Sequence, residues 1–255
     1  METSKFLTTS DSGPYSKCML TVEFAGLQVT NTSVKPSKRL LQSILDFPAP
    51  RDITGVRAWF GLVNQAAYAF AAAKQMAPFR HLLQPKTQFV CPEELDRLFK
   101  ESKQLIADKI TEGVSIFDPQ LTTCLATYFS KTGVGYFLLQ KTCACKSKVP
   151  TCCKEGWRLC LVGSRFLHGA EACYAPIEGE AFGIVHGLQG CRYFSLGCKD
   201  LTLATDHKPL TRVFNDRSLA DIDNRRLMNL KEKTLPYSFT IQHVPGIKHK
   251  GPDAA

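Results

Sequence analysis

Four of the eleven cysteines lie close together, in a lysine-rich segment between positions 141 and 156. They are Cys143, Cys145, Cys152 and Cys153, and groups of four thiolates hold structural zinc in many proteins. The spacing departs from the usual two-residue gap, and adjacent cysteines chelate one ion awkwardly. The sequence therefore favours a solvated insert between two strands, and zinc at this cluster is the less favoured alternative.

Two acidic residues border elements that the sequence predicts to be buried. The segment YAPIEGEAFGIVHGL predicts a helix with Glu180 near its start, and LTLATDHKPL predicts a strand that ends on Asp206 before a helix. Carboxylates can bind a metal ion, and Glu178 is the alternative to Glu180 for that role. Both Glu180 and Asp206 also have simpler possible roles, because acids near a helix N-terminus stabilise the macrodipole and aspartate caps helices. Asp253 lies close to a chain end, where the backbone tends to fray.

Cationic side chains follow Asp206, and the chain carries a net charge of +9 with a pI near 9.0. Such a surface suits a polyanion, although a solvated basic face is the simpler reading. Arg225, Arg226 and Lys208 are the predicted nucleic-acid contacts. His207 is expected to cap or pack, and His249 to lie in an exposed loop. The remaining cations of this stretch are Arg212, Arg217, Lys231 and Lys233.

The elements that must position these residues change character along the chain. Apolar spacing of three and four residues predicts helices over 37–47, 53–70 and 92–110, after a strand or hairpin at 19–30. The period changes after Asp118, which predicts two strands over 122–140 around a turn at Lys131–Gly133 and a third strand over 157–166. A helix at 176–193, a buried strand at 201–205, helices at 208–214 and 222–234 and a strand at 237–244 follow. The order predicts an α/β domain with a mixed sheet behind a helical region.

Composition excludes several classes of protein. The fraction of apolar residues is that of a globular protein. No run approaches about 18 consecutive apolar residues, so no membrane span is expected. The start METSKFLTTSDSG lacks the regions of a secretory signal. We therefore expect an intracellular protein, of cytoplasm or nucleus, that is not secreted and whose cysteines are thiols.

Several stretches, taken in order, resemble the polymerase–nuclease polyprotein of gypsy-class long-terminal-repeat retrotransposons. The resemblance implies the last strands of a reverse transcriptase palm over 1–35, a helical thumb and connection region over 36–118, and an RNase H-like domain, truncated at its C-terminus, over 119–255. The stretches that carry it are TVEFAGLQVT, FPAPRDITGVRAWFGLVN, MAPFRHLLQPKTQFVCPEELDRLFKESK, TYFSKTGVGYFLLQK, SRFLHGAEACYAPIEGEAFGIVHGL, ATDHKPL and HVPGIKHKGPDA.

Two departures from that family bear on activity. The Tyr-x-Asp-Asp turn of the polymerase is absent from the sequence, so no polymerase active site is expected. The first strand of the nuclease carries Thr-Asp followed by one residue and Ser in the family. Here Thr127 and Ser130 match, while Tyr128 stands where the family has its first metal-binding aspartate.

The resemblance implies a magnesium-dependent endonuclease of the RNase H type, which hydrolyses RNA–DNA hybrids with two Mg²⁺ about 4 Å apart. Glu180, Asp206 and Asp253 would be its catalytic metal ligands. A neutral phenol at position 128 cannot replace a carboxylate, so we expect the hydrolase activity to be weak or absent. The expected partners are an RNA–DNA hybrid or other nucleic acid and the remainder of the retroelement polyprotein. The alternative is a non-catalytic nucleic-acid-binding or scaffold module.

Overall fold

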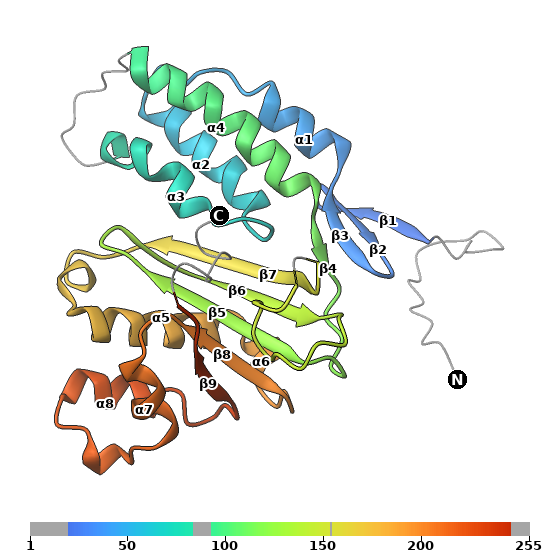
Figure 1. Ribbon diagram of the computed structural model, residues 1–255. Coiled ribbons are helices and arrows are strands. Elements are labelled where there is room, and N and C mark those ends of the chain that lie inside the picture. Colours follow the sequence, from blue (N-terminus) through green and yellow to red (C-terminus); the bar gives the residue numbers. More distant parts are fainter. Residues whose placement is uncertain (1–19, 84–92, 154, 246–255) are drawn as a thin grey trace, which may run out of the picture.

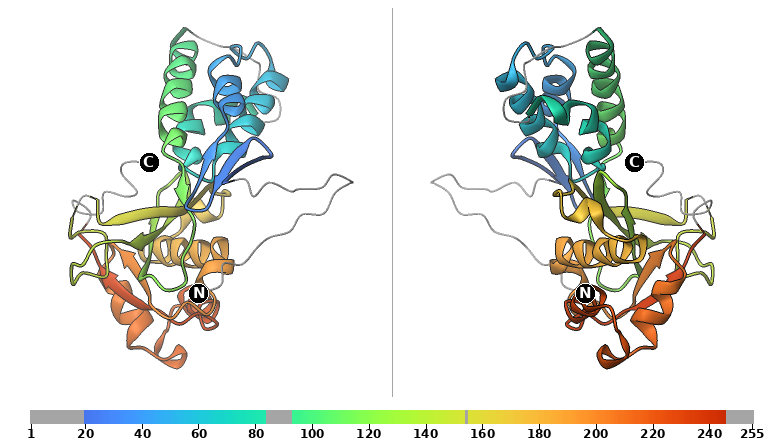
Figure 2. Two further views of the ribbon diagram at one scale, coloured as in Figure 1. Left: turned by 90° about the vertical axis from the view of Figure 1, so that its right-hand side faces the viewer. Right: turned by 90° about the vertical axis from the view of Figure 1, so that its left-hand side faces the viewer.

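The computed structural model describes residues 20–83, 93–153 and 155–245. A mainly helical region lies above a sheet-based region in Figure 1, and the side views of Figure 2 show the same two regions stacked end to end. Among the described residues, no helix is both long enough and apolar enough to span a bilayer.

The upper region contains a small antiparallel sheet with the strand order β1-β2-β3-β4. A tight turn joins the first two strands, with positive φ angles of 51° at Ala25 and 80° at Gly26, as a two-residue hairpin requires. The strands are β1 (Thr21–Phe24), β2 (Leu27–Thr30), β3 (Ser33–Pro36) and β4 (Val114–Ser115). The predicted hairpin is therefore present, and the chain returns to it through β4 after the helices.

The helices of this region bury a common apolar core. Ser37 and Asp52 cap the first two helices by accepting the N–H groups of Leu40 and Gly55. Trp59 is fully buried, and its ring centroid lies 5.0 Å from that of Phe99. The elements are α1 (Lys38–Leu45), α2 (Ile53–Ala66), α3 (Ala72–Met76), the 3-10 helix η1 (Ala77–Leu83) and α4 (Glu93–Thr111).

The lower region is built on a five-stranded mixed sheet with the order β7-β6-β5-β8-β9. The first three strands form an antiparallel meander, and β8 and β9 extend it in parallel. This arrangement confirms the mixed α/β sheet that the sequence predicts. The strands are β5 (Thr123–Phe129), β6 (Gly133–Lys141), β7 (Trp157–Phe166), β8 (Leu201–Thr205) and β9 (Thr240–His243).

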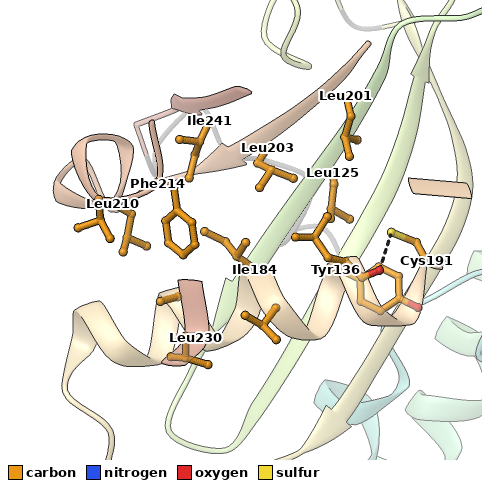
Figure 3. Close-up of a cluster of buried hydrophobic side chains, with 14 of the residues drawn as sticks. Leu125, Tyr136, Ile184, Cys191, Leu201, Leu203, Leu210, Phe214, Leu230 and Ile241 are labelled. Carbon is orange, nitrogen blue, oxygen red and sulfur yellow. Dashed lines mark hydrogen bonds between the residues drawn. The ribbon is translucent and has the colours of Figure 1, made fainter. Parts of the chain in front are cut away.

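Helix α5 (Pro176–Gly190) covers one face of this sheet, and the main core of the region lies between them. Figure 3 shows Ile184 of α5 among side chains from the strands, including Leu125, Leu203 and Ile241. The other helices on this side are η2 (Glu171–Cys173), α6 (Arg192–Ser195), α7 (Pro209–Asn215), η3 (Leu219–Asp221) and α8 (Arg225–Glu232).

The two regions meet at the edge strand β7. The Val162 N–H donates to the carbonyl of Tyr68 at 3.3 Å, and the Ala73 N–H donates to the Ser164 hydroxyl at 3.0 Å. The segment between α2 and α3 thus covers an edge that would otherwise expose unpaired backbone groups. The domain boundaries near 35 and 118 remain predictions.

Candidate metal and nucleic-acid site

The C-terminal ends of β5 and β8 bring the predicted site positions to one end of the sheet. The two strands are parallel neighbours, with Cys124 opposite Thr202 and Ala126 opposite Ala204. Continuing this register by two residues places position 128 level with Asp206. Residues that differ by two point to the same face of a strand, so Tyr128 shares the face of Ala126, opposite α5, while Asp206 directly follows the end of β8.

Glu180 approaches the same strand ends from α5. One of its oxygens, Oε2, is buried and has no hydrogen-bond partner among the described residues. Burial, followed by the negative charge of Asp206, raises the pKa of Glu180 to about 8, and a backbone hydrogen bond at Phe129 partly opposes this. A buried carboxyl oxygen that faces a second carboxylate without a cation is a costly arrangement.

Glu178, one turn before Glu180, is already engaged. Its carboxylate accepts the Ala175 N–H at 3.2 Å, which closes a capping interaction at the start of α5. It also accepts from Asn224 at 2.9 Å and from Arg226 at 2.6 Å, so it joins α5 to α8. The structure thus gives Glu178 a structural role and leaves Glu180 as the acid that reaches the strand ends.

Tyr128 does not extend toward Glu180 and Asp206. Its ring lies across Gly135, the residue opposite it on β6, and its hydroxyl is near Ser164 on β7. Burial raises the pKa of Tyr128 to about 12, so the phenol stays neutral at physiological pH. Because Ser164 also accepts the Ala73 N–H, the phenol belongs to the contact between the two regions.

The position of the Tyr128 ring requires glycine at 135, because a methyl group there would overlap the ring. We expect Gly135→Ala to lower the free energy of unfolding of the chain by about 1–3 kcal/mol, the usual cost of overpacking. In a Tyr128→Asp background the same substitution should cost much less, since the ring is gone. Urea denaturation of the four members of this double-mutant cycle measures the difference. An equal cost in both backgrounds would contradict the packing described.

Asp253 and His249 lie outside the described residues, so their predicted roles stay predictions. His207 follows the strand end directly. Its backbone N–H donates to the Thr205 hydroxyl at 3.2 Å, and its ring Nδ1 is buried without a partner in the described part of the chain. His243 on β9 lies 3.1 Å from the Asp206 carbonyl through its Nε2. Sequence reasoning missed His243, because only the parallel pairing of β8 and β9 brings it to this end of the sheet.

Basic residues line a hollow of about 370 Å³ beside Asp206, around the start of α7. Lys208, Arg212 and Arg217 contribute to its lining. Lys231 does not belong to this surface, because it is buried and donates to the carbonyls of Val213 and Arg217. The sequence alone groups Lys231 with the free cations, and only the packing of α8 against α7 separates them.

The predicted contacts Arg225 and Arg226 differ in their surroundings. Arg225 is exposed at the start of α8. Arg226 forms the ion pair with Glu178 and lies over the ring of Tyr174, 4.5 Å from its centroid. Arg226 therefore stabilises the docking of α8 on α5, whatever else it contacts.

The four clustered cysteines do come together. Their sulfur atoms all lie within 4.8 Å of one another, at the turn that joins β6 to β7. This is the end of the sheet opposite Glu180 and Asp206, because Lys141 pairs with Trp157 there. The described cysteines are all free thiols.

Comparisons with known proteins agree with this architecture. Residues 118–237 match the family of RNase H-like domains found in reverse transcriptases. The retrovirus-related Pol polyprotein from transposon gypsy of Drosophila melanogaster is 25% identical over 247 residues, which cover 91% of this chain and 22% of that protein. The corresponding polyprotein from transposon 297 of the same organism is 25% identical over 233 residues, which cover 91% of this chain and 20% of that protein.

Solved structures show a similar fold. The foamy viral protease-reverse transcriptase in complex with an RNA/DNA hybrid aligns with a TM-score of 0.67 at 14% identity, over 89% of this chain and 29% of that one. The same type of protein in complex with dsDNA aligns with a TM-score of 0.67 at 13% identity, over 89% of this chain and 45% of that one. At such identities the likeness concerns the fold alone.

This chain spans about a fifth of the length of the curated relatives it matches. The match to the family model, the strand order and the similarity to the transposon polyproteins all agree with the resemblance found in the sequence. Residues 118–237 match an RNase H-like domain of the reverse-transcriptase type, and the chain as a whole is similar to part of gypsy-class retrotransposon polyproteins.

Proposed function

We propose that this chain carries an RNase H-type site for RNA–DNA hybrids in which hydrolysis is impaired by the tyrosine at position 128. The observation that supports it is the contrast at the ends of β5 and β8. Burial, and then the nearby charge of Asp206, raise the pKa of Glu180, while the side chain level with Asp206 on β5 is a neutral phenol turned toward Ser164.

The carboxylates fit magnesium in part. The buried Oε2 of Glu180 lacks a partner among the described residues, and a hard oxygen donor beside a second carboxylate is what Mg²⁺ prefers. Glu180 and Asp206 would hold such an ion, and its charge would stabilise the anionic phosphate during hydrolysis. A second ion would need the carboxylate that Tyr128 replaces, so the described residues do not fit a two-metal site.

A non-catalytic module that binds nucleic acid, or serves as a scaffold, is the second candidate function. Two observations favour it. The phenol of Tyr128 lies at the contact between the two regions, and exposed cations line the hollow at the start of α7. Assays of hydrolysis and of binding distinguish the two candidate functions. Slow cleavage of an RNA–DNA hybrid that depends on Mg²⁺ or Mn²⁺ supports the first, and retained binding with no turnover supports the second.

The predicted nucleic-acid contacts can be tested by the salt dependence of binding. We expect Lys208→Gln and Arg225→Gln each to weaken hybrid binding and to reduce the slope of log K against log salt by roughly one, because each removes one phosphate contact. Fluorescence anisotropy with a labelled hybrid measures both quantities. The matched control is Lys35→Gln, an exposed lysine on β3 of the upper region. Unchanged slopes in both test variants would contradict this assignment.

We also propose that the rest of the retroelement polyprotein packs against the upper region. Strand β1 forms the edge of its sheet and carries exposed apolar side chains at Val22 and Phe24, which are 51% and 73% exposed. Apolar groups in a row on an edge strand favour association with another polypeptide segment. By resemblance to the gypsy-class polyproteins, strand β1 would belong to the palm of the polymerase.

A further inference from the structure

The four sulfur atoms of the cysteine cluster have the spacing of a metal site. Cys143 and Cys152 are 3.6 Å apart, Cys145 and Cys153 are 4.0 Å apart, and Cys152 and Cys153 are 3.9 Å apart. Zinc binds thiolates at about 2.3 Å in a tetrahedron, which separates its sulfur ligands by roughly 3.8 Å. A disulfide would require roughly 2.0 Å instead.

The turn between β6 and β7 brings residues that are distant in the segment to one point. The Thr142 N–H donates to the Gly156 carbonyl at 2.9 Å, which continues the pairing of Lys141 with Trp157 into the turn. A methyl group at Gly156 would overlap the sulfurs of Cys143 and Cys153, so glycine there leaves room for them. The pairing of β6 with β7 therefore determines where the four sulfur atoms lie, and the irregular spacing of the cysteines along the sequence does not prevent them from meeting.

The rest of the insert is anchored independently of the cysteines. Val149 is buried against the sheet face opposite α5, and Lys148 forms a 2.7 Å ion pair with Asp200 at the start of β8. The sulfurs are therefore held close together by a preformed loop. A preformed site avoids part of the ordering cost that a flexible loop would incur on binding a metal.

Donors and cations lie beside the cysteine cluster. The Trp157 indole N–H donates to the Cys152 sulfur at 3.4 Å. Lysines at 141, 146 and 148 lie in or beside the insert. They would offset the net negative charge of four thiolates around one divalent ion.

We propose that Cys143, Cys145, Cys152 and Cys153 bind one zinc ion through four thiolates. Four protein ligands in a closed set are typical of structural zinc, which leaves no open position for catalysis. The ion would fasten the β6–β7 turn at the end of the sheet remote from Glu180 and Asp206. The site is therefore independent of the nuclease function, and its test does not require activity.

The test uses the full chain, purified under reducing conditions, incubated with zinc and dialysed. Elemental mass spectrometry should find about one zinc per chain. Cys143→Ser and Cys152→Ser should lose the bound ion, whereas Cys173→Ser, an exposed cysteine of η2, should retain it. Far-UV circular dichroism shows whether each variant folds. Equal zinc content in all variants would overturn the proposal.

Cobalt titration of the unmutated chain keeps the proposal testable even if a serine variant fails to fold. Tetrahedral Co²⁺ with four sulfur ligands should show strong thiolate-to-metal charge-transfer and visible d–d bands, and zinc should displace it. The emission of Trp157 should change in the same titration. Absence of these bands with all four thiols reactive, retention of iron in place of zinc, or pairing of the four as disulfides in reducing buffer would each refute the zinc site.

Discussion

Replacing Tyr128 with aspartate is expected to raise magnesium-dependent cleavage of an RNA–DNA hybrid by at least about 100-fold, the scale of one charge-stabilising group in an active site. The register of β5 and β8 puts this position level with Asp206, beside the backbone that meets Glu180. An aspartate there would supply the carboxylate that the second ion lacks. Single-turnover cleavage of a labelled hybrid, with Mg²⁺ and with EDTA, measures the gain.

Tyr128→Asn is the matched control for this experiment. It removes the same ring and leaves the same space over Gly135, but it adds no charge. We expect no gain in cleavage from the asparagine variant. Both variants should melt below the unmutated chain, because the packing of the ring against Gly135 and its neighbours is lost.

The stability of these two variants separates packing from electrostatics. In EDTA, Tyr128→Asp should melt below Tyr128→Asn, since a third carboxylate repels the charge of Asp206. Added Mg²⁺ should raise the melting temperature of the aspartate variant and leave that of the asparagine variant nearly unchanged. If the aspartate variant shows neither cleavage nor a magnesium-dependent shift, position 128 does not belong to the site.

Glu180→Gln is expected to stabilise the chain at alkaline pH in the absence of divalent metal. The pKa of Glu180 is raised from 4.5 to about 8 in the folded chain, mainly by burial. Below pH 4.5 the carboxyl is protonated in both states, so it imposes no penalty. As the pH rises from 4.5 through 8, the unfolded chain ionises first and folding is weakened, by at most roughly 5 kcal/mol.

The free energy of unfolding of Glu180→Gln should not show this decrease with rising pH. Urea denaturation from pH 4.5 to 9 in EDTA should therefore give curves that coincide at the acid end and separate as pH increases. Glu232→Gln, at an exposed position of α8, is the control and should follow the unmutated chain. Mg²⁺ should narrow the separation, because it favours the ionised carboxylate of Glu180. Parallel curves for Glu180→Gln and the unmutated chain would contradict the buried position of this acid.

Much of the fold follows from local patterns that the sequence displays. The short, mostly apolar runs of β5 and β6 and the helical spacing of α5 reflect which side chains must leave water, so the types of these elements can be predicted without a structure. The sequence does not predict α3, η1 or the two-residue β4. These short elements have weak periodicity and are held by packing between the two regions.

Two predicted helices differ from the observed ones because of the conformation or side chain of a single residue. The predicted helix over 176–193 divides at Cys191, whose φ of −101° and ψ of 23° leave the helical range. The predicted helix over 222–234 begins later, because the Asn224 side chain accepts the Leu227 N–H and caps it there. Such backbone and cap geometry depends on neighbours that a one-dimensional pattern does not contain.

The sequence by itself showed that Glu180 and Asp206 border elements predicted to be buried, and the family resemblance predicted that Tyr128 stands where a carboxylate belongs. Only the tertiary structure decided where the phenol points, because the space over Gly135 and the hydroxyl of Ser164 come from strands that pair across the sheet. It likewise decided that four awkwardly spaced cysteines share one point. Side-chain convergence is a property of strand register and packing, and residue spacing along the chain does not encode it directly.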